Sequence, residues 1–205
     1  MAELEIPVVQ TERLVLRGFR EADVDGLFAL AQDPLIAEYV TYNNAPLREA
    51  CWRSIALWMG HWALRGFGIW AVEERSTGTF IGRIGLWRPE GWPGTEVGWL
   101  LGRAFWGHGY ATEAARASLD WGFTHLDVPE LVSLIRPENT PSIAVAERIG
   151  ERYRREVPFR GGTTGEWAIT RAEWESARAE AQPRQPRKPE SRAGGTSLRH
   201  DGPRG

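Results

Sequence analysis

The sequence predicts a single α/β domain, built on a mixed, mostly antiparallel sheet of about seven strands with helices on both faces. Its 205 residues suffice for one domain with a sizeable core, because 42% of them are hydrophobic and 11 are tryptophan. The predicted elements run β, α, α, β, β, β, α, β, α, β, β, so that a three-stranded meander precedes two βα units. A glycine-rich turn between a strand and a helix, at residues 107–109, is the third observation and points to function.

Two helices are predicted to follow the first strand. Residues 13–19 alternate between apolar and polar side chains, as a strand does. Residues 21–33 carry apolar side chains at helical spacing, and the helix should end before Pro34. A longer helix is predicted over residues 46–66, with Gly66 as its stop. Its apolar face is predicted to hold Trp52, Ile55, Met59 and Trp62.

The middle of the chain is predicted to form a hairpin, a further strand and a helix. Residues 68–75 and 79–89 have the period of two that strands show, and a Ser-Thr-Gly turn joins them. A loop rich in glycine and proline then leads to a strand over residues 95–102. Beyond the glycine turn, residues 110–123 have helical periodicity. The glycine turn therefore joins the end of a strand to the start of a helix.

The last elements are a buried strand, a capped helix and a closing hairpin. Residues 131–137 are a short, nearly continuous apolar run, as in a buried strand. Asn139 or Thr140 is predicted to cap the next helix, which Gly150 ends. Residues 152–176 then contain two strand-like segments, with a glycine-rich turn between them, and a short final helix.

Composition excludes several classes of protein. With one cysteine, Cys51, the chain has neither an internal disulfide framework nor a cysteine-rich metal site, and we expect no metal. No stretch approaches the ~20 apolar residues that a membrane-spanning helix needs. The first residues carry acids and lack the apolar run of a signal peptide, so we expect a cytoplasmic protein.

The charge divides the chain into two parts, a folded domain over residues 1–181 and a tail over residues 182–205. The tail holds six arginine and lysine residues against two acids and is rich in proline and glycine, so we expect it to be disordered. Because the whole chain carries a net charge of −2, the domain itself is acidic. An acidic domain argues against a nucleic-acid partner and for a cationic substrate.

Two known phosphate-binding loops compare poorly with the glycine turn. The phosphate-binding loop of nucleoside triphosphatases needs a lysine, and the one lysine of the chain, Lys188, lies in the tail. The dinucleotide-binding pattern G-x-G-x-x-G needs a glycine where Thr112 stands. That pattern also needs an acid at the end of the next strand, which here ends in Arg136 and Pro137. The missing lysine excludes a nucleoside triphosphatase loop. The mismatches at Thr112 and at the end of the next strand leave only weak support for a dinucleotide-binding loop.

A third interpretation rests on the physics of helix ends. The first backbone N–H groups of a helix that begins near Tyr110 have no partners inside the helix, and the helix dipole adds partial positive charge. A pyrophosphate would bind there without a lysine. Gly109 lets phosphate oxygens approach the backbone, and Ala111 keeps the floor of the site small. The alternative is a purely structural turn whose glycines adopt positive φ.

The residues around this turn resemble the acyl-CoA pyrophosphate loop of the GNAT acetyltransferases, whose pattern is Q/R-x-x-G-x-G/A. Trp106 stands at the Q/R position, Gly109 is the central glycine and Ala111 is the final small residue. Tryptophan departs from the superfamily consensus, yet W-G-x-G-Y-A-T-E-A is the form typical of the RimJ/RimL-type branch.

Two further segments resemble the same branch. Asn139, Ser142 and Gly150 match its second signature, and the opening TERLVLR resembles its T-x-R-L-x-L-R start. Together the three segments cover about residues 10–172 in the order of the family. One departure is Glu151, which with its neighbour Arg152 stands where the family more often has an aromatic or apolar residue.

The resemblance implies an N-acetyltransferase domain with a sheet splayed between its fourth and fifth strands. It implies acetyl-CoA as cosubstrate and direct attack by a primary amine, without a covalent enzyme intermediate. The backbone from His108 to Thr112 would hold the pyrophosphate, and the strand edge from Trp99 to Leu101 would pair with the pantetheine arm. Leu100 or Leu101 would direct an N–H at the thioester oxygen. The full cofactor set implied is Trp99, Leu100, Leu101, Trp106, Gly107, His108, Gly109, Tyr110, Ala111, Thr112, Asn139 and Ser142.

Three residues are candidates for proton transfer. An amine with a pKa of about 10 is charged at neutral pH and must lose a proton before it attacks. Glu96, where the family often has a glutamate acting through water, is the candidate base, and strand alternation places it on one face with Gly98 and Leu100. Ser142 or Tyr153 would protonate the leaving thiolate. For Asn139, a role as the cap of the following helix explains the residue as well as the contact with coenzyme A that the resemblance implies.

The acceptor is predicted less closely. A peptide or protein N-terminus is the expectation for the branch, and a small amine is the second choice. Aromatic side chains that would wall the acceptor site are Tyr39, Tyr42, Trp87 and Trp92. Glu38 or Glu90 would attract a cationic amine. A homodimer is a family-level expectation. The alternative class of function is an acyl-CoA-binding sensor or interaction module without catalysis.

Overall fold

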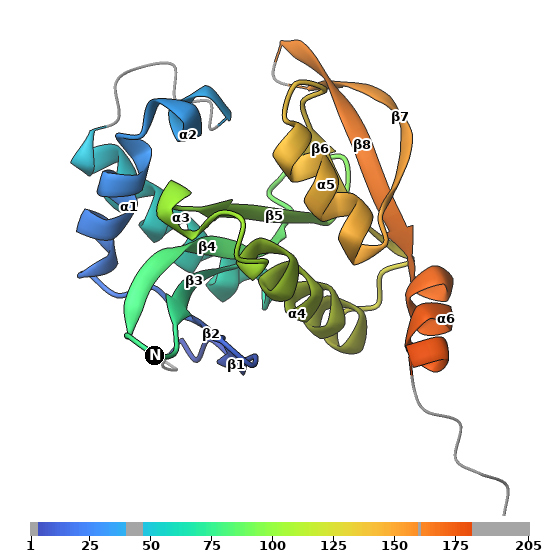
Figure 1. Cartoon of the computed structure of the whole chain (residues 1–205), viewed down its shortest axis with the longest axis horizontal. Helices are drawn as coiled ribbons and strands as arrows, with labels where there is room; N and C mark the ends of the chain where they lie inside the picture. Colours follow the sequence, from blue (N-terminus) through green and yellow to red (C-terminus); the bar gives the residue numbers. More distant parts are fainter. Residues whose placement is uncertain (1–3, 40–46, 160, 182–205) are drawn as a thin grey trace, which may run out of the picture.

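The computed structural model describes residues 4–39, 47–159 and 161–181, and these form one eight-stranded sheet with helices on both faces (Figure 1). The strands follow the order β1-β2-β3-β4-β5-β6-β8-β7 across the sheet. Their bounds are β1 Val9–Gln10, β2 Leu14–Arg17, β3 Ile69–Glu74, β4 Thr79–Trp87, β5 Glu96–Leu101, β6 Glu130–Ile135, β7 Arg152–Phe159 and β8 Gly162–Thr170. The predicted fold class is confirmed, with one short strand, β1, beyond the seven expected.

Six α-helices complete the described part of the chain. Their bounds are α1 Asp23–Ala31, α2 Pro34–Tyr39, α3 Arg48–Arg65, α4 Tyr110–His125, α5 Thr140–Ile149 and α6 Arg171–Ala181. A single 3-10 turn, Arg103–Phe105, lies between β5 and α4. The predicted tail at residues 182–205 lies outside the described residues.

The sheet is antiparallel except where β5 meets β6. These two strands run parallel and share one residue pair, Glu96 with Val132. Beyond that pair they part, and β6 continues in register with β8 instead. We call this point of separation the fork. Because β1 precedes the seven predicted strands, β5 and β6 are the fourth and fifth of that set, so the expected splay is confirmed.

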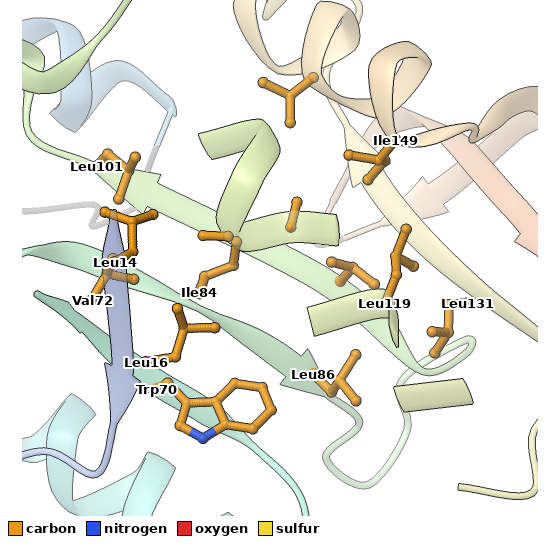
Figure 2. Close-up of a cluster of buried hydrophobic side chains, with 14 of the residues drawn as sticks. Leu14, Leu16, Trp70, Val72, Ile84, Leu86, Leu101, Leu119, Leu131 and Ile149 are labelled. Carbon is orange, nitrogen blue, oxygen red and sulfur yellow. The ribbon is translucent and has the colours of Figure 1, made fainter. Parts of the chain in front are cut away.

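Two hydrophobic clusters hold the helices on opposite faces of the sheet. The larger cluster joins α4 and α5 to the sheet, and Figure 2 shows Leu119 and Ile149 of these helices near strand residues such as Leu131. The smaller cluster joins α1 and α3 to the sheet through residues such as Ile55 and Trp58. Complete burial of such side chains contributes about 1.5–3 kcal/mol each.

The apolar face of α3 differs from the prediction at its first turn. Trp52 is 48% exposed, whereas Cys51, one residue earlier, is buried against α1. The buried face of the helix consists of Cys51, Ile55, Trp58, His61 and Trp62. A face that includes Trp52 and a face that includes Cys51 both fit the spacing of a helix. Periodicity alone does not show which of them packs against α1, so the predicted face was wrong at this turn.

The predicted helix ends are confirmed, because each depends on local sequence. Gly66 ends α3 and Gly150 ends α5, both in the left-handed conformation. The Asn139 side chain caps α5 by accepting a hydrogen bond of 3.2 Å from the Ser142 backbone N–H. That bond is the capping role which the sequence left open for Asn139.

Candidate active site

A cavity of about 930 Å³ lies at the fork. Residues of β5, of the first turns of α4 and α5, and of the turn between β5 and α4 line one part of it. Residues of α3, of β4 and of the end of β7 line the other part. We call these the cofactor half and the acceptor half. The cavity is large enough for a drug-sized ligand and its partner.

The register of β5 shows which of its amides face the fork. The Gly102 N–H donates to the Ile81 carbonyl at 2.9 Å, so the even-numbered residues of β5 exchange hydrogen bonds with β4. The N–H groups of Trp99 and Leu101 therefore point away from β4. Because the β5–β6 register ends at Glu96, neither residue has a strand partner on that side within the described chain. Two amides were predicted to bind the thioester oxygen. The Leu100 N–H is hydrogen-bonded to β4, whereas the Leu101 N–H faces the fork.

The turn before α4 presents backbone donors to the same cavity. Gly107 and Gly109 both have φ of 78°, a left-handed conformation that favours glycine. Gly109 is the N-cap of α4, and no side chain caps the helix in the described structure. The first intrahelical bond runs from the Glu113 N–H to the Gly109 carbonyl at 3.0 Å, so the N–H groups of residues 110–112 have no helical partner. Tyr110, Ala111 and Thr112 all line the cavity.

Trp106 and His108 connect the turn to its neighbours, β5 on one side and α4 on the other. The Trp106 indole N–H donates to the Leu101 carbonyl at 2.8 Å, which ties the turn to the end of β5. His108 is exposed, and its ring stacks on Tyr110 with 5.8 Å between ring centroids. Neither the sequence nor the family pattern suggested the indole bond, because it depends on the fold of the turn.

A network centred on Arg13 and Glu113 connects β2 to the turn. The Arg13 guanidinium donates to Glu113 Oε2 at 2.7 Å and to the His108 carbonyl at 2.9 Å. Glu113 Oε1 also accepts from the Thr11 hydroxyl at 2.6 Å. Burial opposes ionisation of Glu113, but the bonds from Thr11 and Arg13 outweigh it and hold its pKa below the ordinary value. The TERL opening and the glycine turn are therefore parts of one structure.

Replacing Glu113 with glutamine is expected to loosen the turn. Arg13 would lose its charged partner, so we expect the free energy of unfolding to fall by about 1–3 kcal/mol at neutral pH and CoA binding to weaken. The difference from wild type should shrink as the pH falls through the lowered pKa of Glu113, where wild type loses the same charge. Urea unfolding of Glu113→Gln and of the exposed control Glu147→Gln at several pH values measures this. Equal stabilities at neutral pH would show that the network contributes nothing.

Glu96 lies where the two halves of the cavity meet. Its carboxylate Oε2 accepts a hydrogen bond of 2.7 Å from the Trp92 indole N–H. Val97 and Leu101 point into the large core cluster, so Glu96 shares the other face of β5 with Gly98 and Leu100, as alternation predicts. Among the described residues that line the cavity, Glu96 is the one carboxylate.

The two candidate acids occupy different places. Ser142 lines the cofactor half, and its hydroxyl accepts from the Trp99 indole N–H at 3.3 Å. Tyr153 is absent from the described lining and 52% exposed, because β7 turns its ring over Gly165 and against Trp167, with 5.7 Å between ring centroids. The structure thus brings Ser142 to the cavity and not Tyr153.

Aromatic side chains wall the acceptor half. Trp87 and Trp92 line it as predicted, and Phe159 at the end of β7 packs edge-on against Trp92 at 4.8 Å between centroids. Sequence reasoning missed Phe159 and Arg83, and the Arg83 guanidinium lies 5.0 Å from the centre of the Trp58 ring. Trp58 itself lies on the helix that was predicted over residues 46–66. Strand alternation could have placed Arg83 on the face away from the large core.

The other predicted acceptor residues are not at the cavity or are not described. Glu90 is 99% exposed and pairs with Arg65 at 3.1 Å, away from the lining. Tyr42 lies outside the described residues, as do the side chains of Glu38 and Tyr39. Within the described ranges there is no group of three or more potential metal ligands. No helix found there is long and apolar enough to cross a membrane.

Comparison with known proteins places this geometry in a family. The sequence profile of the acetyltransferase (GNAT) domain matches residues 13–152. The uncharacterised protein YkkB of Bacillus subtilis is 36% identical over 155 residues, which cover 72% of this chain and 86% of YkkB. The uncharacterised N-acetyltransferase p20 of Bacillus licheniformis is 33% identical over 136 residues, 65% of this chain and 75% of p20.

A solved structure shows the same architecture. The acetyltransferase of Agrobacterium tumefaciens superposes with a TM-score of 0.73 at 32% identity, covering 82% of this chain and 97% of its own. The profile match spans more than half of this chain; it begins at Arg13 of the TERL opening and includes the glycine turn and the fork. The protein therefore belongs to the GNAT acetyltransferase family.

Proposed function

We propose that the protein transfers the acetyl group of acetyl-CoA to a primary amine by direct attack on the thioester. One observation carries the proposal: a single cavity joins the unpaired amides at the start of α4, the open edge of β5 and the carboxylate of Glu96. The first feature suits a diphosphate, the second an amide-rich arm, and the third the removal of a proton.

The cofactor half is matched to coenzyme A along its length. The amides of residues 110–112 would hold the pyrophosphate, and Arg148 of α5 lines the same end of the cavity as a positive charge. The amides of Trp99 and Leu101 would pair with the pantetheine arm as a further strand does. The Leu101 N–H would stabilise negative charge on the thioester oxygen during attack.

The acceptor half supports an amine with one positive charge beside an apolar or aromatic body. Glu96 is the one described carboxylate of the lining, which suits an acceptor with a single ammonium group. The walls are Trp58, Trp87, Trp92 and Phe159. A peptide N-terminus with an apolar first residue fits this arrangement, as does an arylalkyl amine. The W-G-x-G-Y-A-T-E-A motif supports the RimJ/RimL-type branch and so favours the peptide.

Glu96 and Ser142 divide the proton transfers in this proposal. Glu96 would take the proton of the ammonium, through a water molecule, so that the neutral amine attacks the carbonyl carbon. The C–S bond then breaks, and Ser142 would protonate the departing thiolate. The thiolate is a weak base with a pKa near 8.5, so this second step contributes less. Positioning of amine and thioester supplies on the order of 7–11 kcal/mol in well-oriented reactions.

The test is mass spectrometry of acetyl-CoA reactions with a panel of peptides, arylalkyl amines and polyamines. Acetylated amine together with free CoA thiol is the expected result, strongest for acceptors with one charge. Binding of CoA without any acetylated product would instead support a non-catalytic acyl-CoA sensor. Failure to bind CoA would contradict both functions.

We further propose a bacterial cytoplasmic protein with an acetyltransferase domain over residues 1–181 and a basic tail over residues 182–205. The arginine-rich composition of the chain supports a bacterial origin. A chain ending at residue 181 should then retain turnover. A homodimer is the proposed assembly, and light scattering would test it.

A further inference from the structure

Glu151 is a buried acid that the proposed reaction does not use. It follows Gly150 at the end of α5, and its backbone N–H donates to the Ala146 carbonyl at 3.0 Å. Its exposed fraction is 0%. A carboxyl group in such a position is costly unless hydrogen bonds or loss of charge compensate for its burial.

The contacts of Glu151 favour an uncharged carboxyl. The Ser133 hydroxyl lies 2.8 Å from the Val97 carbonyl and 2.9 Å from Glu151 Oε1. The Val97 carbonyl has no proton to give, so its 2.8 Å contact is a hydrogen bond only when the single Ser133 proton points to it. The second contact is then a hydrogen bond only if Glu151 carries a proton and donates it to Ser133.

Other observations agree with an uncharged Glu151. Its Oε2 has no hydrogen-bond partner in the described structure. Burial raises the pKa of its carboxyl well above the ordinary value, and the negative charge of Glu96 adds to this. A Ser133 proton donated to Glu151 would lower the pKa, but in the arrangement above that proton is donated to the Val97 carbonyl. Charged residues on the adjoining elements are Glu96 on β5, Glu147 and Arg148 on α5, and Glu166 on β8, which pairs with Arg155 at 2.9 Å.

The chain of hydrogen bonds ends at the fork. Val97 follows Glu96, the last residue of β5 in register with β6, and Ser133 follows its partner Val132. Ser133 also lines the cavity. The position of Val97 therefore affects both the side chain of Glu96 before it and the open amides of Trp99 and Leu101 after it.

We propose that Glu151 is a positioning residue for acetyl transfer: as an uncharged acid it donates to Ser133, which holds the Val97 carbonyl and with it the spacing of the fork. At high pH an ionised Glu151 would attract the Ser133 proton away from Val97. It would also place a second negative charge near Glu96. That added charge would stabilise the ammonium form of the acceptor, which cannot attack the thioester. Turnover in wild type should therefore fall at alkaline pH through Glu151.

The first test is the pH dependence of kcat from about pH 6 to about pH 10. Glu151→Gln keeps an N–H donor toward Ser133 but cannot ionise, so its alkaline decline should move up by about one pH unit or more, or disappear. The exposed Glu147→Gln on the same helix should keep the wild-type profile. An alkaline decline in Glu151→Gln that matches wild type would overturn the proposal. This test depends on the proposed function.

The second test needs neither an acceptor nor a variant that folds. The infrared spectrum of wild type at neutral pH should contain the stretching band of a protonated, buried carboxyl that shifts in heavy water. Glu151→Gln, where it folds, should lack that band, and Glu147→Gln should retain it. Absence of the band in wild type would refute an uncharged Glu151 even if acetyl transfer itself is confirmed, and its presence would stand even if no acceptor is found.

Discussion

Gly109→Val is expected to weaken CoA binding by about 100-fold or more, because it removes two or more charge-assisted hydrogen bonds of about 1.5–3 kcal/mol each. Gly109 has φ of 78°, which a β-branched residue adopts only with strain. A valine side chain would also stand where phosphate oxygens must approach the amides of residues 110–112. Isothermal titration calorimetry with CoA measures the change directly.

The matched control for this change is Gly78→Val in the turn between β3 and β4. Gly78 has φ of 70° and open space around it, so valine imposes similar backbone strain away from the cavity. Gly78→Val should lose stability yet bind CoA like wild type. If Gly109→Val binds CoA as tightly as its parent, the turn is structural and the proposed diphosphate site is wrong.

Glu96→Gln is expected to lower kcat by about 10²–10⁴-fold at neutral pH, the range typical of a lost general base. The affinity for CoA should change little, because the carboxylate faces the acceptor half while the amides that would bind CoA lie on the turn and on the other edge of β5. The loss should become smaller as the pH approaches the acceptor's own pKa of about 10, where free amine forms without a base.

Glu96 could act as the general base, or it could serve only to accept the hydrogen bond from Trp92. Steady-state kinetics over this pH range, with a peptide acceptor, distinguish these two roles. Glu90→Gln is the control, since Glu90 is exposed and lies outside the described lining of the cavity. It should leave kcat unchanged. A Glu96→Gln protein with wild-type turnover at neutral pH would remove this carboxylate from the mechanism, and the Trp92 hydrogen bond would then be its whole role.

Local features of the fold were predictable from the sequence, and features set by distant contacts were not. Gly66, Gly150 and Asn139 end or cap helices through their own backbone and side-chain chemistry, so each was found. The two-residue strand β1 exists only because it pairs with β2, and a segment so short has no periodicity. Trp52 was misplaced because helical spacing alone does not say which neighbouring face the packing covers.

The same distinction applies to the candidate site. The glycine turn and Glu96 belong to one continuous stretch, and pattern alone indicated both. The bond between Arg13 and Glu113 joins segments 100 residues apart, and Phe159 reaches the cavity from a different hairpin. The choice of Leu101 over Leu100 needed the register with β4, which follows from pairing and not from the order of residues.

The single residue pair between β5 and β6 has a consequence for the abundance of the protein. A cosubstrate bound at the fork would form hydrogen bonds with the open edge of β5 and so connect the two parts of the sheet. A ligand present at a hundred times its Kd stabilises the folded state by about 2.7 kcal/mol. Because proteases cleave the unfolded chain, the protein with bound cosubstrate would be degraded more slowly than the free protein.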